Sequence, residues 1–333
     1  PRPQFVGDIG LQTVPNKLHK AVFTQRPIER TWCVLVVEVH GVDCCHVLTL
    51  AHIAHAHRTH LAVCSTEMWT AMLHQRCEIV STSGGLSDDG AMSDSSNTAP
   101  KIKDVDFGDL LYLEPHGPDT YVGIVARYPW GNRLFGGQVV AQALAAAMAT
   151  VAPDRRPHSL HSYFIRPGST TEPIRFEVER LRDGRSFCTR QVVALQSGGA
   201  ILNVSVSFQV DEDEADAQIA KLPEGLALPD DPTLENYSWG NLIDRRAVDL
   251  PGQDGEPWRL GYWLRIMDED GALLGDAPVK HTLAMALLSD PAPSRAARSP
   301  HPDFANYTSD RPKLQGATLH HSVCFPRPCR TPT

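Results

Sequence analysis

Four histidines stand close together near the N-terminus, and their side chains could bind a metal ion. They are His52, His55, His57 and His60, in the stretch CCHVLTLAHIAHAHRTH. Imidazole nitrogens are common metal ligands, and histidine-rich tracts do bind metals. The spacing matches no standard zinc pattern, however, and no second cluster of ligands accompanies it. We therefore predict no metal site.

A second group of polar residues occurs twice. The sequences SLHSYFIRPG and LHHSVCFPRP both carry His-Ser, an aromatic residue and Arg-Pro, and they lie 160 residues apart. The first pair is His161 and Ser162, and the second is His321 and Ser322. Adjacent residues of a strand point to opposite faces, so His320 and His321 are not expected to bind one metal ion together. The repetition indicates that a structural unit is built twice.

The elements around the first copy are a helix and an antiparallel meander. A charge-free, alanine-rich segment opens at Gly136 and is predicted to form a helix to about Val151. Gln138 and Gln142 make it too polar for a membrane span, so we predict a buried helix. The segment IRFEVERL alternates strictly between apolar and charged residues, as a half-buried strand does. The strands predicted here are 109–114, 120–126, 158–166, 174–181, 186–195 and 200–210.

The second copy follows the same order of elements. Residues 211–254 are acidic and proline-rich, which favours a connection with short helices. A strand at 260–266, a helix at 279–289 and a strand at 315–325 come next. One apolar helix is the economical cover for the apolar face of such a sheet. The sequence therefore predicts an α+β fold in which a sheet wraps around a long helix, duplicated.

Composition limits the cellular role. The net charge is −8, and nothing in the composition suggests nucleic-acid binding, which would need a basic face. The eight cysteines show no CxxC pairing, so we expect a reducing compartment, cytoplasmic or peroxisomal. Residues 1–103 hold eight of the fifteen histidines and five of the eight cysteines, and they end in a polar linker. We interpret residues 1–103 as an extension of unknown fold, poorly ordered and outside the domain.

Several motifs resemble those of the acyl-CoA thioesterase II family, also called the TesB-like family. RLFGGQVVAQAL, HSLHSYFIRPG and LRDGRSF carry the resemblance in the first half. WLRI, LLSD and ATLHHSVCFPRP follow in the family's order in the second half. The resemblance covers roughly residues 105–333 and implies a double hotdog fold. The domain boundaries that follow are 104–212 for the N-terminal hotdog, 213–258 for a linker and 259–333 for a partial C-terminal hotdog.

The resemblance also implies an activity and a site. Family members hydrolyse acyl-CoA to a fatty acid and CoA with no metal or organic cofactor. An Asp, a Ser or Thr and a Gln hold the attacking water. By motif, Asp290 and Thr318 match the first two. The implied partner is the acyl-CoA substrate, in a homo-oligomer without a membrane span.

General chemistry is consistent with these roles. A carboxylate can orient a water and accept its proton. At the C-terminal end of a helix, the charge of Asp290 would be disfavoured and its pKa raised. Gly136 and Gly137 would let a ligand approach a helix N-terminus closely. Taken alone, Asp290 is also an ordinary turn residue, Thr318 an ordinary strand residue, and the two glycines a means of tight helix packing.

The sequence departs from the family pattern in its second half. The family's Gln has no match, and a polar, proline-rich stretch occupies residues 291–314. We therefore expect an incomplete second hotdog in a C-terminally truncated chain. The alternative function is a non-catalytic acyl-CoA-binding or assembly protein that keeps the fold. A hotdog hydratase or dehydratase is disfavoured, because residues 133–142 contain no Asp or His.

Overall fold

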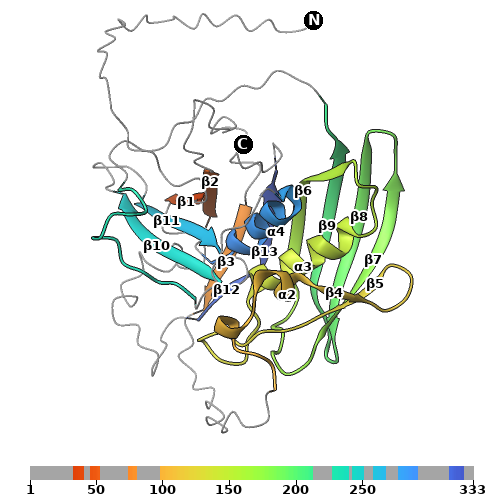
Figure 1. Cartoon of the computed structure of the whole chain (residues 1–333), viewed down its shortest axis with the longest axis horizontal. Helices are drawn as coiled ribbons and strands as arrows, with labels where there is room; N and C mark the ends of the chain where they lie inside the picture. The colour runs from red at the N-terminus through yellow and green to blue at the C-terminus, as the bar shows by residue number, and fades with distance from the viewer. Residues whose placement is uncertain are drawn as a thin grey trace, which may run out of the picture.

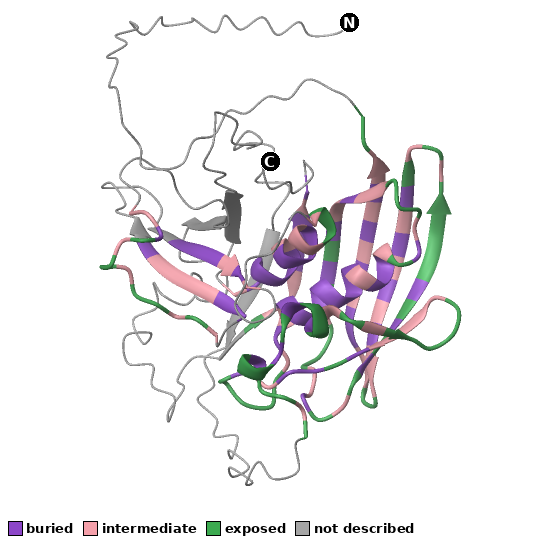
Figure 2. Ribbon diagram, viewed as in Figure 1, coloured by how far each residue is buried: buried purple, intermediate pink, exposed green. Residues whose placement is uncertain are grey.

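In the residues that it describes, the computed structural model has two antiparallel sheets and two principal helices, α3 (Gly136–Met148) and α4 (Pro278–Leu288). Figure 1 shows α3 lying against the larger sheet, and Figure 2 shows buried residues concentrated in both helices and in the strands that α3 covers. The structure describes residues 33–40, 46–52, 74–80, 98–212, 227–239, 242–250, 258–267, 277–291 and 315–325.

The larger sheet has seven strands in the order β13-β6-β9-β8-β7-β5-β4. Its central strands alternate between buried and exposed residues, as the sequence predicts, so that one face meets α3. Ile174, Phe176 and Val178 of β7 are all buried. The strands are β4 (Leu113–Pro115), β5 (Thr120–Gly123), β6 (Arg155–Phe164), β7 (Ile174–Asp183), β8 (Phe187–Gln196), β9 (Gly199–Val210) and β13 (His320–Cys324).

Helix α3 is buried almost all round. Ten of its thirteen residues are buried, which is typical of a core helix rather than of an amphipathic surface helix. Gln138 and Gln142 donate hydrogen bonds to the carbonyl of Ile124, and Gln142 also donates to that of Leu110, so both side-chain NH2 groups find acceptors within the core. Within the described part of the chain, no helix is long and apolar enough to cross a membrane.

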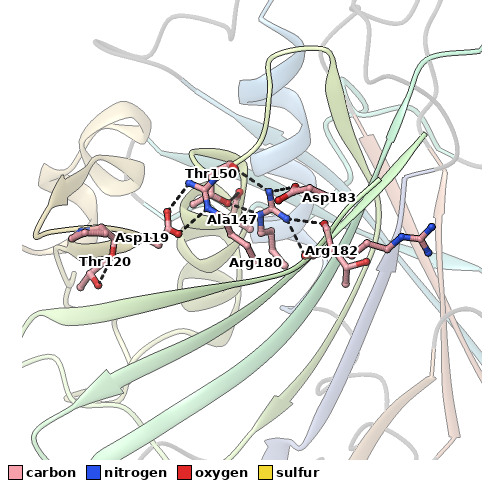
Figure 3. Close-up of polar contacts among 10 residues, drawn as sticks. Asp119, Thr120, Ala147, Thr150, Arg180, Arg182 and Asp183 are labelled. Atoms are coloured by element: carbon pink, nitrogen blue, oxygen red, sulfur yellow. Dashed lines mark hydrogen bonds and ion pairs between the residues drawn. The ribbon is translucent and has the colours of Figure 1, made fainter. Parts of the chain in front are cut away.

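Arg190 attaches the end of α3 to the sheet. Its guanidinium is only 1% exposed and donates to the hydroxyl and the carbonyl of Thr150, just beyond the helix, and to the carbonyl of Arg182. Arg190 also donates to the carboxylate of Asp183 at 2.5 Å. Figure 3 labels Thr150, Arg182 and Asp183, the residues that accept these hydrogen bonds. A cation beside a helix C-terminus also interacts favourably with the helix dipole.

The second sheet has six strands in the order β10-β11-β1-β2-β3-β12. Three of them come from the N-terminal region that we expected to lie outside the domain, and that expectation is corrected for these three segments. β1 pairs antiparallel with β11, and β3 pairs antiparallel with β12. The strands are β1 (Cys33–His40), β2 (His46–His52), β3 (His74–Val80), β10 (Ile243–Leu250), β11 (Trp258–Ile266) and β12 (Gln315–Thr318).

The N-terminal strands stand where the first half places its meander. Reading each sheet from its outer edge, β4-β5-β7-β8-β9-β6 corresponds to β10-β11-β1-β2-β3-β12. The expected gap in the second hotdog is therefore occupied by β1, β2 and β3 of the same chain. The physical reason is that an unpaired edge such as that of β11 exposes N–H and C=O groups, and the β-branched segment CVLVVEVH can satisfy them.

The repeated His-Ser phrase pairs with itself. In the antiparallel pair of β6 and β13, His161 lies opposite Ser322, and Ser162 lies opposite His321. The Nδ1 atom of His161 is 2.9 Å from the hydroxyl of Ser322, and the hydroxyl of Ser162 donates to the carbonyl of His321. The two copies of the phrase thus lie on β6 and β13, the strand pair along which the two structural units meet.

Three predicted elements differ from the structure. Residues 109–114 were expected to form one strand, but Phe107–Leu111 forms the short helix α2 because Phe107 and Leu110, one turn apart, are both buried. Residues 243–250 form strand β10 rather than part of a connection with short helices, since they pair with β11. The strand expected at 315–325 is divided at Leu319, whose carbonyl accepts from the N–H of Phe164.

Candidate functional site

Asp290 and Thr318, which the motifs single out, lie together in the structure. The hydroxyl of Thr318 donates to Oδ1 of Asp290 at 3.1 Å. The backbone N–H of Gly137 donates to Oδ2 of the same carboxylate at 3.0 Å. Asp290 is 7% exposed, so these bonds hold it in one place within a largely buried setting. The chain thus brings a buried carboxylate, a hydroxyl and a helix N-terminus to one point.

Close packing of the two helices creates this point. A Cβ on Gly137 would lie 2.3 Å from the carbonyl of Leu287 in α4, and one on Gly136 would lie 2.7 Å from the carboxylate of Asp290. Neither position has room for a side chain. Gly137 therefore serves helix packing and donates to Asp290, whereas the sequence left packing and ligand approach as alternatives for both glycines.

The electrostatic setting of Asp290 differs from the one that its place in the sequence suggests. It follows the C-terminal end of α4, where the helix dipole disfavours a negative charge. Its carboxylate, however, accepts the N–H of Gly137 in the first turn of α3. The free N–H groups and the dipole at that N-terminus stabilise the negative charge. The tertiary contact thus opposes the effect that we expected from α4 alone.

An aromatic cluster adjoins the N-terminus of α3. Tyr128 stacks on Trp130 with ring centroids 4.9 Å apart, and both rings contact Phe135, which precedes α3. The hydroxyl of Tyr128 donates to Oε1 of Gln138. Burial raises the pKa of Tyr128, so the phenol stays protonated and keeps that donor. Trp130 remains 46% exposed beside the site.

The histidines proposed and rejected as metal ligands are only partly described. His55, His57 and His60 lie outside the described residues, and His52 is described as part of strand β2. Among the residues that the structure describes, no group of three or more His, Cys, Asp or Glu side chains could hold a metal ion.

Sequence reasoning missed two groups at the site. The N–H of Gly137 could not be assigned to Asp290, because a contact spanning 153 residues leaves no local signal. Ser289 and His321, whose side chains meet at 2.9 Å beside Asp290, were also missed. The repetition of His-Ser was the one available clue to His321.

Comparison with known proteins supports the thioesterase family that the sequence motifs resemble. The family model described as the acyl-CoA thioesterase N-terminal domain matches residues 125–209. The chain is 37% identical over 164 residues to acyl-coenzyme A thioesterase 8 of Mus musculus, covering 49% of this chain and 48% of that protein. It is 45% identical over 120 residues to acyl-CoA thioesterase 2 of Haemophilus influenzae, covering 36% and 40% of the two chains. The chain thus spans about half the length, or less, of these curated relatives.

A solved structure extends the likeness across both halves. The acyl-CoA thioesterase II TesB2 of Mycobacterium marinum is 32% identical, with a TM-score of 0.54. The match covers 68% of this chain and 80% of that one. Among the described residues, two antiparallel sheets with one principal helix each form a double hotdog fold. The chain belongs to the acyl-CoA thioesterase II, or TesB-like, family.

Proposed function

We propose that the chain hydrolyses fatty acyl-CoA to a free fatty acid and CoA, with a water molecule held by Asp290 and Thr318. The observation that carries the proposal is the convergence of the Thr318 hydroxyl and the Gly137 N–H on the carboxylate of Asp290. Membership of the thioesterase II family supports the reaction class.

Carboxylate and hydroxyl groups are chemically suited to hold a water between them. Each carboxylate oxygen of Asp290 accepts one of the bonds described, and a carboxylate oxygen can accept more than one hydrogen bond. The Thr318 hydroxyl donates to Asp290, and its own lone pairs can accept a hydrogen bond from water. The water would attack the thioester carbonyl carbon while its proton passes to Asp290. Collapse of the tetrahedral intermediate breaks the C–S bond, and the departing thiolate takes up the proton.

The oxyanion formed by this attack needs hydrogen-bond donors. We assign this role to the backbone N–H of Gly136, in the first turn of α3, where N–H groups have no acceptor within the helix. The neighbouring N–H of Gly137 is already donated to Asp290.

The test is release of free CoA thiol from acyl-CoAs of different chain length, with the wild-type chain beside Asp290→Asn. Asn keeps the shape of the side chain but cannot accept the proton. We expect kcat to fall by about 10²–10⁴, the usual contribution of a general base. Asp231→Asn is the matched control, because the carboxylate of Asp231 accepts hydrogen bonds from Thr233, two residues along the chain, rather than from the groups that meet at Asp290.

The result also separates the competing functions. Turnover that is lost in Asp290→Asn and kept in Asp231→Asn supports the hydrolase. Binding of acyl-CoA without turnover in either chain would favour the non-catalytic binding protein. Equal turnover in wild type and Asp290→Asn would remove Asp290 from the mechanism.

A further inference from the structure

A second buried polar pair lies directly beside Asp290. The hydroxyl oxygen of Ser289 is 2.9 Å from Nε2 of His321, and these residues are 5% and 2% exposed. Ser289 caps the C-terminal end of α4 and immediately precedes Asp290. His321 lies on β13, three residues after Thr318. The proposed reaction uses neither side chain, although buried polar groups of this kind are costly unless they bond.

The direction of this hydrogen bond follows from its neighbours. The Ser289 hydroxyl donates its single proton to the carbonyl of Ala286 at 2.9 Å. It must therefore accept from His321, which places the imidazole proton on Nε2. Burial, with a smaller effect of His320, lowers the pKa of His321 to about 4. The ring is thus neutral at physiological pH, with one N–H committed to Ser289.

This bond joins the two segments that supply the proposed site. Asp290 comes from the end of α4, and Thr318 comes from β12, 28 residues later. Residues 292–314, which connect these segments, are outside the described part of the chain. His321 is fixed on the sheet side, because its carbonyl accepts from Ser162 and its strand pairs with β6. The Ser289–His321 bond consequently ties the end of α4 to the strand unit that carries Thr318.

We propose that His321 is a positioning residue that acts through Ser289 to hold the Asp290 carboxylate within bonding distance of Thr318 and of the Gly137 N–H. The geometric part of this proposal stands on the contacts themselves. Its kinetic part rests on the proposed hydrolysis.

The repeat supplies a matched control. His161 and Ser322 form a second His–Ser hydrogen bond, also 2.9 Å long, on the same pair of strands. Ser322 also lies 3.0 Å from Nε2 of His320, so this second group connects strand residues with one another. A general loss of a His–Ser bond in this sheet can therefore be separated from loss of the tie to α4.

The experiment measures amide hydrogen exchange at Gly137 in Ser289→Ala, His321→Leu, His321→Gln and the control His161→Leu. The Gly137 N–H reports the position of Asp290, because a first-turn amide has no acceptor within its helix. We expect exchange at Gly137 to be at least tenfold faster in Ser289→Ala and His321→Leu, and unchanged in His161→Leu. The amide of Gln in His321→Gln can donate in place of Nε2–H and should restore slow exchange.

Steady-state kinetics with acyl-CoA test the positioning role of His321 in a second way. We expect kcat to fall at least tenfold in Ser289→Ala and His321→Leu with KM within about threefold, and to recover in His321→Gln. Unchanged Gly137 exchange in Ser289→Ala would overturn the proposal, as would equal effects of His321→Leu and His161→Leu. If the wild type shows no turnover, the exchange data still decide the positioning role. If His321→Leu fails to fold, Ser289→Ala decides it.

Discussion

Gly137→Ala tests whether the close approach of α3 and α4 builds the site. The new methyl carbon would lie 2.3 Å from the carbonyl oxygen of Leu287, where ordinary contact begins at 3.4 Å, and 2.6 Å from the ring of Phe135. The carbonyl belongs to the backbone of α4 and cannot rotate away, so the helices must separate by about 1 Å. Overpacking of this kind typically lowers the free energy of unfolding by about 1–3 kcal/mol. Because the contacting atom is backbone, we expect a loss of about 3 kcal/mol here.

Gly108→Ala is the matched control. Gly108 lies in helix α2 with nothing within 4 Å of the added Cβ, so its replacement should stabilise the chain by about 0.5–1 kcal/mol through helix propensity. The assay is thermal and urea unfolding of the three chains. We expect the midpoint to fall on the order of 5–10 °C in Gly137→Ala and to rise slightly in Gly108→Ala.

Gly137→Ala should also reduce CoA release, because moving α3 withdraws the N–H that Asp290 accepts. The reasoning would be refuted if Gly137→Ala unfolded at the wild-type midpoint, since the stated contact distance would then have no energetic consequence. It would also be refuted if both alanine variants shifted the midpoint in the same direction by similar amounts.

Two further predictions concern pH and strand pairing. The folded-state pKa of His321, about 4, is below the unfolded value of about 6.5. The unfolded chain therefore binds more protons between these values, and the stability present above pH 6.5 is lost as the pH falls toward 4. Urea unfolding at pH 7.5 and 4.5 should show a loss of about 2–3 kcal/mol in wild type beyond that in His321→Gln. Equal losses would contradict burial of the neutral ring. For the pairing, Val36→Pro should speed amide exchange in β11, because Val36 lies opposite Gly261 and proline removes a ladder N–H. Val36→Ala should not do so, and slow β11 exchange in the proline variant would argue against the place of β1 in the sheet.

Local patterns predicted most of the first half. The alternating segment IRFEVERL forms β7, and the charge-free run after Gly136 forms α3. Both patterns could be recognised because they depend only on residues that are neighbours in the sequence. The same local reasoning failed at β10, whose residues become a strand because β11 offers a pairing partner. Strand formation depends on such a partner, which the local sequence does not contain.

The sequence by itself determined which residues to examine at the site. The motifs single out Asp290 and Thr318, and the repeated His-Ser phrase marks the two paired strands β6 and β13. Residue types that can do chemistry, and the spacing at which they repeat, are properties of the linear order of the chain, so the order of the residues is enough to find them.

Only the tertiary structure decided the surroundings of these residues. It placed Asp290 at the N-terminus of α3 rather than only at the C-terminus of α4, and it joined His321 to Ser289. It also brought β1, β2 and β3 into the second sheet. The physical reason is common to all three: hydrogen bonds between segments far apart in the chain depend on which donors, acceptors and strand edges meet after packing, and no local pattern records that meeting.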